Sequence, residues 1–346
     1  MKTINWVIAH EPIDLFLRAA TKFSARLAEL TQGQLEVKVY TLSEYNRQLD
    51  FAQKPLTHND VLAEVEAGRV EMTQSYTPQL GKYLRDMHVL DLPFLFRDHG
   101  HAKKILDGEV GADLLNRLNS QSEVRGLAFT YSGGFRIIPS TQAIQAVEDF
   151  KGLRLRVSEK SPIAYDTFAA VGAVPVPMVI ENIPNEVRAG EITGGESTYP
   201  RVYGMNQNEV CGYVNETEHS LFLTGIVINA KFYNELTADQ QKAIHTAAYE
   251  AAQAERVEAV EDIQHVKERA SRMESEWCAC PVKSWIVSRR RPRACTPNTR
   301  TISVPGWYSV SSTPGNTRKV PRKTPPRRGF SLRLTKIAIS GTMFLL

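Results

Sequence analysis

The chain has 346 residues and a formal net charge of +4, and this length exceeds what one hydrophobic core usually organises, so two lobes are expected. The charge is unevenly placed: residues 277–346 contain 14 Lys and Arg and no Asp or Glu, whereas residues 1–276 contain 28 Lys and Arg and all 38 Asp and Glu. The acidic body excludes a uniformly basic nucleic-acid binder, and its single cysteine, Cys211, excludes a disulfide-built scaffold.

The first predicted elements form a β-α-β unit. An apolar run at residues 4–9 is typical of a strand, residues 13–30 carry apolar side chains at helical spacing, and residues 35–40 alternate as a strand does. Two parallel strands with a right-handed crossover are therefore expected. The predicted strand follows Met1 and Lys2 without a signal-peptide pattern, and we find no run of 18 apolar residues that would span a membrane.

Strands and helices continue to alternate along the chain, which indicates an α/β fold. A strand expected at residues 124–131 ends at Gly133 and Gly134, where a turn is predicted. The other expected strands are residues 70–75, 153–157, 174–178, 210–215 and 223–229, and the other expected helices are residues 59–67, 101–106, 111–120 and 161–170.

The last regular element is a long helix. Thr237 and Gln240 match a capping box, and the helix that they open could run to Glu276, about 60 Å at 1.5 Å per residue. A helix of this length outreaches one lobe, so we expect it to bridge two.

The sequence lacks the common motifs of catalysis and cofactor binding, namely a Gly-rich phosphate loop, a dinucleotide fingerprint, HExxH and a G-x-S-x-G nucleophile elbow. His99 and His101 form a close pair without further ligands nearby, and Cys278, Cys280 and Cys295 match no standard zinc-finger spacing. No metal, cofactor or catalytic residue is therefore predicted.

Residues 277–346 form a separate segment that is rich in Arg, Pro, Ser and Thr and has no periodic apolar face. This composition is typical of disorder. The abrupt change at the end of the long helix also favours out-of-frame sequence. A third interpretation is a basic arm for nucleic acid or a membrane surface, although no nucleic-acid partner is expected for the protein as a whole.

Two arginines lie in apolar strand contexts, Arg136 in Gly134-Phe135-Arg136-Ile137-Ile138 and Arg156 in Leu153-Arg154-Leu155-Arg156-Val157. A buried charge needs an anionic partner, and a guanidinium matches a carboxylate with two parallel hydrogen bonds. The pattern is compatible with a ligand carboxylate and equally with internal salt bridges to Asp or Glu.

Taken in order, several segments of residues 4–276 resemble the periplasmic solute-binding proteins of TRAP (tripartite ATP-independent periplasmic) transporters, of the dicarboxylate-binding type. The segments are residues 33–40, 65–72, 89–96, 133–136, 150–157, 171–173 with 177–178, 190–196 and 218–229.

The resemblance implies an α/β, two-lobed periplasmic-binding-protein-like fold with a central cleft and a long helix that bridges both lobes. Lobe I is expected to comprise residues 1–130 and about 219–255, lobe II residues 131–218, and the bridging helix residues 237–276. Residues 277–346 resemble no part of the family.

The resemblance also implies the ligand-binding residues. Arg156 matches the arginine that holds the ligand carboxylate, and Arg136 matches a second arginine that assists. Ser197 stands where the family often has Asn. Further contributions are expected from the end of the first strand and from three aromatic or histidine side chains, namely His10, Glu11, Tyr76, Tyr199 and His219.

The predicted function is that of an extracytoplasmic solute receptor and not an enzyme. Such a receptor binds a small organic acid or sugar acid, has no cofactor, and delivers the ligand to membrane permease subunits of the TRAP system. Its implied location is the periplasm. The alternative is an enzyme that acts on a small carboxylate in an interlobe cleft, with His10, Glu11 or His219 as general base.

Overall fold

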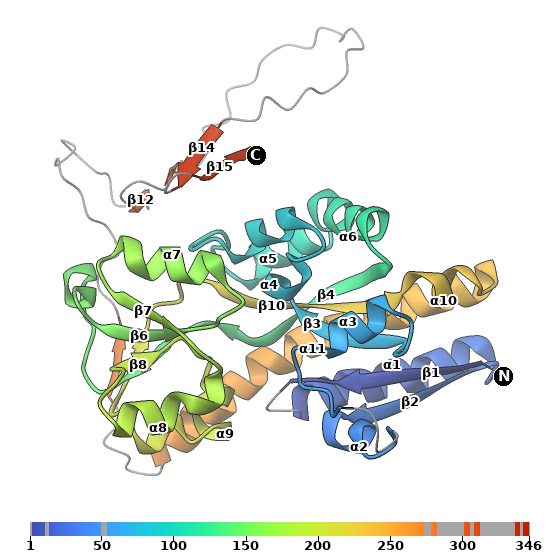
Figure 1. The fold of residues 1–346 in the computed structure, drawn as a ribbon, viewed down its shortest axis with the longest axis horizontal. Coiled ribbons are helices and arrows are strands. Elements are labelled where there is room, and N and C mark those ends of the chain that lie inside the picture. Colours follow the sequence, from blue (N-terminus) through green and yellow to red (C-terminus); the bar gives the residue numbers. More distant parts are fainter. Residues whose placement is uncertain are drawn as a thin grey trace, which may run out of the picture.

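The structure, a computed structural model, describes residues 2–10, 14–49 and 54–272 and five short strands further along the chain. Two sheets with helices packed around them build two lobes that lie side by side (Figure 1). We call the lobe built on the first sheet lobe I and the lobe built on the second sheet lobe II.

The sheet of lobe I has five strands in the order β2-β1-β3-β10-β4. Neighbours β2, β1 and β3 run parallel, whereas β10 runs antiparallel to both β3 and β4. The bounds are β1 (Lys2–Ile8), β2 (Leu35–Thr41), β3 (Met72–Tyr76), β4 (Val124–Phe135) and β10 (Leu221–Asn229).

The predicted β-α-β unit is confirmed. Helix α1 (Asp14–Thr31) joins β1 to β2, and these strands pair in parallel from Lys2 opposite Leu35 to Ile8 opposite Thr41. The helix buries Phe16, Phe23 and Leu27 against the sheet because these residues recur at helical spacing.

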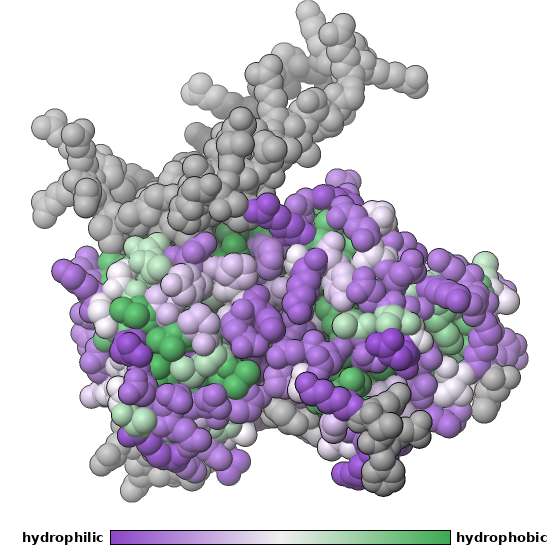
Figure 2. Space-filling model, in the orientation of Figure 1, coloured by the Kyte–Doolittle hydropathy of each residue, from purple (hydrophilic) through white to green (hydrophobic). Residues whose placement is uncertain are grey.

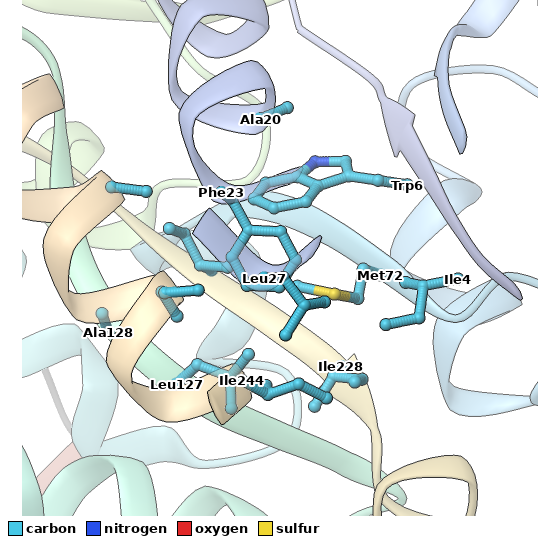
Figure 3. Close-up of a cluster of buried hydrophobic side chains, with 14 of the residues drawn as sticks. Ile4, Trp6, Ala20, Phe23, Leu27, Met72, Leu127, Ala128, Ile228 and Ile244 are labelled. Atoms are coloured by element: carbon cyan, nitrogen blue, oxygen red, sulfur yellow. The ribbon is translucent and has the colours of Figure 1, made fainter. Parts of the chain in front are cut away.

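The core of lobe I lies between this sheet and helices α1 and α11 (Figure 3). Trp6 and Phe23 meet edge to face with ring centroids 5.1 Å apart, and Met72 and Ile244 complete the cluster from β3 and α11. Aromatic pairs in this geometry add stabilisation beyond the area that they bury.

The sheet of lobe II has the strand order β11-β9-β5-β8-β6-β7. Strand β6 lies between β8 and β7 and is parallel to both, so its side chains are held in the middle of the sheet. The bounds are β5 (Ile138–Ser140), β6 (Arg154–Val157), β7 (Val174–Pro177), β8 (Gly194–Gly195), β9 (Tyr213–Glu216) and β11 (Cys278–Pro281).

The expected end of the fourth strand was wrong. Strand β4 does not stop before Gly133 and Gly134 but continues through both to Phe135. The two glycines have φ values of +92° and +76°, which L side chains rarely adopt, so they bend the strand without ending its pairing with β10. The chain then passes from lobe I to lobe II through Arg136 and Ile137.

The long helix α11 (Ala238–Arg272) bridges the lobes and runs diagonally from one to the other (Figure 1). The predicted capping box is present: the Thr237 N–H donates to Gln240 Oε1 at 3.1 Å, and the Gln240 N–H donates to Thr237 Oγ1 at 3.3 Å. Its first half packs small side chains on lobe I, whereas Ile263 and Val266 pack on lobe II. The predicted two-lobed α/β fold is confirmed, and the exact lobe boundaries stay a prediction.

The other helices cover the two sheets. They are α2 (Leu42–Asn46), α3 (Val61–Glu66), α4 (Thr77–Leu80), α5 (His99–Leu106), α6 (Glu109–Gln121), α7 (Pro162–Ala170), α8 (Ile183–Arg188), α9 (Tyr199–Gly204) and α10 (Ala230–Asn234). Among the residues that the structure describes, no helix combines the length and the apolar character that crossing a membrane requires.

The predictions for residues 277–346 mostly lie outside the described residues. In this segment the structure describes β11, which pairs in parallel with β9, and two antiparallel pairs. These pairs are β12 (Thr301–Val304) with β13 (Tyr308–Ser311) and β14 (Lys336–Ile339) with β15 (Thr342–Leu345).

Candidate functional site: a cavity between the lobes lined by buried arginines

A cavity lies between the two lobes. The face of the molecule seen in Figure 2 is mostly hydrophilic. Lobe I contributes mainly histidine, aromatic and amide side chains, and lobe II contributes most of the charged ones. The lining residues of lobe I are Ala9, His10, His58, Asn59, Tyr76, Pro78, Gln79 and Phe222, and the others are Arg136, Arg156, Ser158, Glu159, Lys160, Met178, Val179, Ile180, Glu181 and Arg201.

Arg156 lies in the middle of the lobe II sheet, on β6, and is 5% exposed. Its Nε donates to the Met178 carbonyl at 2.9 Å, and its Nη1 donates to the Glu196 carbonyl at 3.5 Å. Burial lowers the pKa of Arg156 to about 10, with smaller effects in the same direction from Arg201 and Arg136. Even so, the guanidinium stays charged at neutral pH.

A glycine on the neighbouring strand makes room for this arginine. Gly195 of β8 lies opposite Arg156 in the parallel register. A Cβ atom at Gly195 would lie 2.8 Å from the Arg156 Cβ and 3.2 Å from its carbonyl oxygen. The close approach of the two strands therefore requires glycine at this position.

Arg136 carries an internal carboxylate partner. It forms a buried salt bridge through Nη1 with Glu196 Oε1, and its guanidinium carbon lies 3.7 Å from the centroid of the Phe222 ring. Burial alone would raise the pKa of Glu196, but the nearby Arg136, His219 and Arg156 hold it at about 2. For Arg136, the internal salt bridge that the sequence left open is therefore present.

A third buried arginine, Arg201 of α9, was missed by the sequence analysis. It is 7% exposed and donates through Nη2 to the Tyr76 hydroxyl, which joins lobe II to lobe I across the cavity. Its guanidinium also lies 4.7 Å from the centroid of Phe222. Arg201 follows a proline at the start of a helix. The sequence around it therefore lacks the alternation of apolar residues that indicated burial of Arg136 and Arg156.

His10 and Tyr76 form the aromatic wall of lobe I. Their ring centroids are 3.8 Å apart, and Tyr76 stacks on Phe222 at 4.6 Å. Burial lowers the pKa of His10 well below its usual range, and the charges of Arg201 and His58 act in the same direction. His10 is therefore a neutral side chain in a cavity that contains several cations.

The structure brings Arg136, Arg156, His10 and Tyr76 to the cavity and places three other predicted residues elsewhere. Ser197 is buried on the Ile137 bridge, and the Tyr199 hydroxyl donates to Glu216 at 2.6 Å outside the cavity. His219 lies behind the salt bridge, with Nε2 3.4 Å from Glu196 Oε2, and lines a smaller neighbouring cavity. Glu11 lies outside the described residues.

The described residues include no group of three or more His, Cys, Asp or Glu side chains placed to hold a metal ion. The cavity lining is therefore suited to binding an anion and not to holding a metal ion. It presents guanidinium groups, neutral hydrogen-bonding groups and aromatic faces, which together suit a small anion with polar substituents.

Residues 8–279 match the model of the DctP family, bacterial extracellular solute-binding protein family 7. The 2,3-diketo-L-gulonate-binding periplasmic protein YiaO of Escherichia coli is 30% identical over 248 residues, which cover 72% of each chain. A TRAP periplasmic solute-binding protein of Roseobacter denitrificans with bound L-galactonate is 26% identical with a TM-score of 0.68, covering 82% of this chain and 89% of that one.

A further TRAP periplasmic solute-binding protein, from Xanthobacter autotrophicus with bound β-D-galacturonate, is 25% identical with a TM-score of 0.70. That alignment covers 81% of this chain and 90% of the other. The predicted family and receptor class are confirmed, and the enzyme alternative is not supported. This chain belongs to bacterial extracellular solute-binding protein family 7, whose members serve TRAP transporters as solute receptors and not as enzymes.

Proposed function

We propose that this receptor binds a small organic acid in the cavity between its lobes, with the ligand carboxylate on Arg156, and presents it to the membrane permease subunits of a TRAP system. The periplasm is its proposed place of work. The observation that carries the proposal is a buried guanidinium that lines the cavity and is bonded to neutral carbonyl oxygens.

The contacts of Arg156 differ from those of Arg136. Arg136 has the Glu196 carboxylate, whereas no carboxylate oxygen of the described residues lies within 4.0 Å of the Arg156 guanidinium nitrogens. A guanidinium has five N–H donors, and two carbonyls leave some of them for another acceptor. A buried guanidinium without a directly bonded carboxylate would gain charge-assisted hydrogen bonds from an incoming one.

The relatives support an acid as the ligand. The proteins of Roseobacter denitrificans and Xanthobacter autotrophicus hold L-galactonate and β-D-galacturonate, and YiaO is named for 2,3-diketo-L-gulonate. Each of these compounds combines one carboxylate with several oxygen substituents. Compounds of this kind are therefore the first candidates for this receptor.

Closure of the lobes would complete the site. Two hydrogen bonds join the lobes across the cavity: Arg201 donates to Tyr76, and Asn59 Nδ2 donates to Glu159 Oε1 at 3.4 Å. A ligand that enters between separated lobes and bonds to both would favour this closed arrangement by hinge motion. The closed form is the one that permease subunits would recognise.

The proposal is tested by calorimetric titration of Arg156→Ala with whichever sugar acid raises the melting temperature of the wild-type protein. Loss of one member of a buried, hydrogen-bonded charge pair typically costs about 2–5 kcal/mol, so we expect an affinity about 30-fold to several thousandfold lower. Arg156→Lys should also weaken binding, because an ammonium cannot reproduce the planar fork.

Arg154→Ala is the matched control. Arg154 lies two residues away on the same strand, but its side chain is 50% exposed and faces Glu191 at 3.6 Å. It should leave the affinity within about threefold, because exposed ion pairs contribute little. If Arg156→Ala folds and binds the acid as tightly as the wild type, Arg156 does not hold the carboxylate.

A further inference from the structure

A chain of hydrogen bonds leads from the core of lobe I to lobe II. Within lobe I, Ser75 Oγ donates to Gln79 Oε1 at 2.9 Å, and Gln79 Nε2 donates to Asn59 Oδ1 at 3.4 Å. Asn59 Nδ2 then donates to Glu159 Oε1 of lobe II at 3.4 Å. Because Gln79, Asn59 and Glu159 all line the cavity, this chain runs along its wall and joins its two sides.

The Glu159 carboxylate sets the direction of this chain. An ionised carboxylate can only accept hydrogen bonds, so Asn59 donates to it through the amide nitrogen and turns its oxygen toward Gln79. Gln79 must then donate through its own amide nitrogen, which leaves its oxygen for the Ser75 hydroxyl. The side chains of lobe I therefore present an oriented donor, and only an acceptor on lobe II can complete the chain.

The bond between Asn59 and Glu159 lies on the solvent side of the cavity. The Glu159 side chain is 39% exposed, whereas Arg201, which makes the other hydrogen bond between the lobes through Tyr76, is 7% exposed. The cavity is thus bridged by an inner bond and an outer bond. A bound molecule that leaves by separation of the lobes would have to break the outer one.

Glu159 lies on the loop that continues strand β6, three residues after Arg156. Lys160 Nζ lies 3.1 Å from Glu159 Oε1, and Ser158 Oγ accepts from the Lys160 N–H at 3.3 Å. The loop is therefore tied to itself and to the strand. Any rigid movement of lobe II carries Arg156 and Glu159 together, so an acid on Arg156 and the bond to Asn59 depend on the same closing motion.

We infer that Asn59 and Glu159 form a latch between the lobes, and that the opening of this latch determines how fast the bound acid leaves. The latch stabilises the closed arrangement through a bond between the lobes and not through contact with the ligand. Its effect therefore falls on the dissociation rate and not on the association rate. This inference rests on the proposed function, since it requires a ligand in the cavity.

Asn59→Asp tests the latch by replacing its donor with a second carboxylate opposite Glu159. Gln79 can still donate to the new carboxylate, so the rest of the chain in lobe I is kept. We expect the ligand to dissociate about tenfold faster while its association rate changes less than about threefold. Repulsion between the added charge and an anionic ligand would instead appear mainly in the association rate.

The double variant Asn59→Asp with Glu159→Gln separates a latch from a ligand contact. Here the new amide of lobe II can donate to the new carboxylate of lobe I, so the bond forms again with its direction reversed. Dissociation should return to within about threefold of the wild-type rate. Recovery in this variant would also show that Asn59→Asp does not act by impairing folding.

Asn182→Asp is the matched control. It makes the same substitution at an exposed residue next to Glu181, outside the cavity lining, and should leave the dissociation rate within about twofold. Rates are measured on the full chain by stopped-flow fluorescence, with energy transfer between dyes at the exposed positions Lys38 of lobe I and Lys151 of lobe II. The probe is whichever of L-galactonate, D-galacturonate and 2,3-diketo-L-gulonate the wild-type protein binds.

Different results would overturn the two proposals. An unchanged dissociation rate in Asn59→Asp, or a double variant that releases the acid as fast as Asn59→Asp, would overturn the latch while Arg156→Ala still weakened acid binding. If the folded wild-type protein bound none of these acids, or if Arg156→Ala bound them as tightly as the wild type, the proposed function would fail, and the inference with it.

Discussion

Replacing Glu196 by Gln should destabilise the folded protein, because Arg136 would lose its buried carboxylate. The Glu196 side chain is 2% exposed, and the surrounding cations hold its pKa at about 2 against an ordinary value of 4.5. That difference corresponds to about 3 kcal/mol of stabilisation at neutral pH, and breaking a buried pair typically costs about 3–5 kcal/mol. We therefore expect Glu196→Gln to lower the free energy of unfolding by about 3–5 kcal/mol.

The pH dependence of stability follows from the same pair. Because the folded-state pKa of Glu196 is depressed, its contribution is present above the ordinary pKa of 4.5 and is lost as the pH falls toward about 2. Urea unfolding followed by circular dichroism, at pH 7 and at steps below pH 5, should show this loss in the wild type. In Glu196→Gln that part of the acid sensitivity should be missing.

Glu191→Gln is the matched control for the Glu196 prediction. Glu191 faces Arg154 at 3.6 Å, but the two side chains are 63% and 50% exposed, so solvent screens the pair and its loss should cost less than about 1 kcal/mol. If Glu196→Gln and Glu191→Gln cost the same, the reasoning from burial is refuted. Such a result would mean that Arg136 moves to another partner or to solvent when the Glu196 carboxylate is removed.

Two further changes test other parts of the fold. Burial raises the pKa of Glu255 to about 8, so its stabilising neutral form is lost as the pH rises from about 4.5 toward 8. Urea unfolding should show that Glu255→Gln is more stable than the wild type at pH 9, by on the order of 4 kcal/mol, and differs little from it at pH 4. If the stabilities of the two proteins changed with pH in parallel, this prediction would be contradicted. Gly133→Ala should lower the free energy of unfolding by about 1–3 kcal/mol more than Gly190→Ala does in the same assay. Equal losses in the two variants would contradict this prediction. Both glycines have positive φ, but a Cβ at Gly133 would lie 2.7 Å from Thr198 Oγ1, whereas nothing lies within 4 Å at Gly190.

Much of the fold could be predicted because periodicity and capping are local properties of the chain. The β1-α1-β2 unit and the box formed by Thr237 and Gln240 agree with the structure for this reason. The break predicted at Gly133 and Gly134 was wrong, because glycine at positive φ can bend a strand whose pairing with β10 continues. The continuity of that pairing depends on a strand about 90 residues further along the chain.

The site could be predicted in part. Charged side chains in apolar strands identified Arg136 and Arg156, and both line the cavity. Which of them is paired with an internal carboxylate could not be predicted, because the deciding group is Glu196, 60 residues from Arg136 and 40 from Arg156. Its carboxylate pairs with Arg136, and its carbonyl accepts from Arg156.

The sequence by itself determined the order of the elements, the family and the two arginines of the strands, because these depend on local patterns and on motifs in a fixed order. Only the tertiary structure decided that Arg201 joins the lobes through Tyr76 and that His10 lines the cavity with its Nε2 buried and without a partner among the described residues. The physical reason is that burial and hydrogen bonding depend on distances through space. The folded chain sets those distances by packing two sheets and a bridging helix around the cavity.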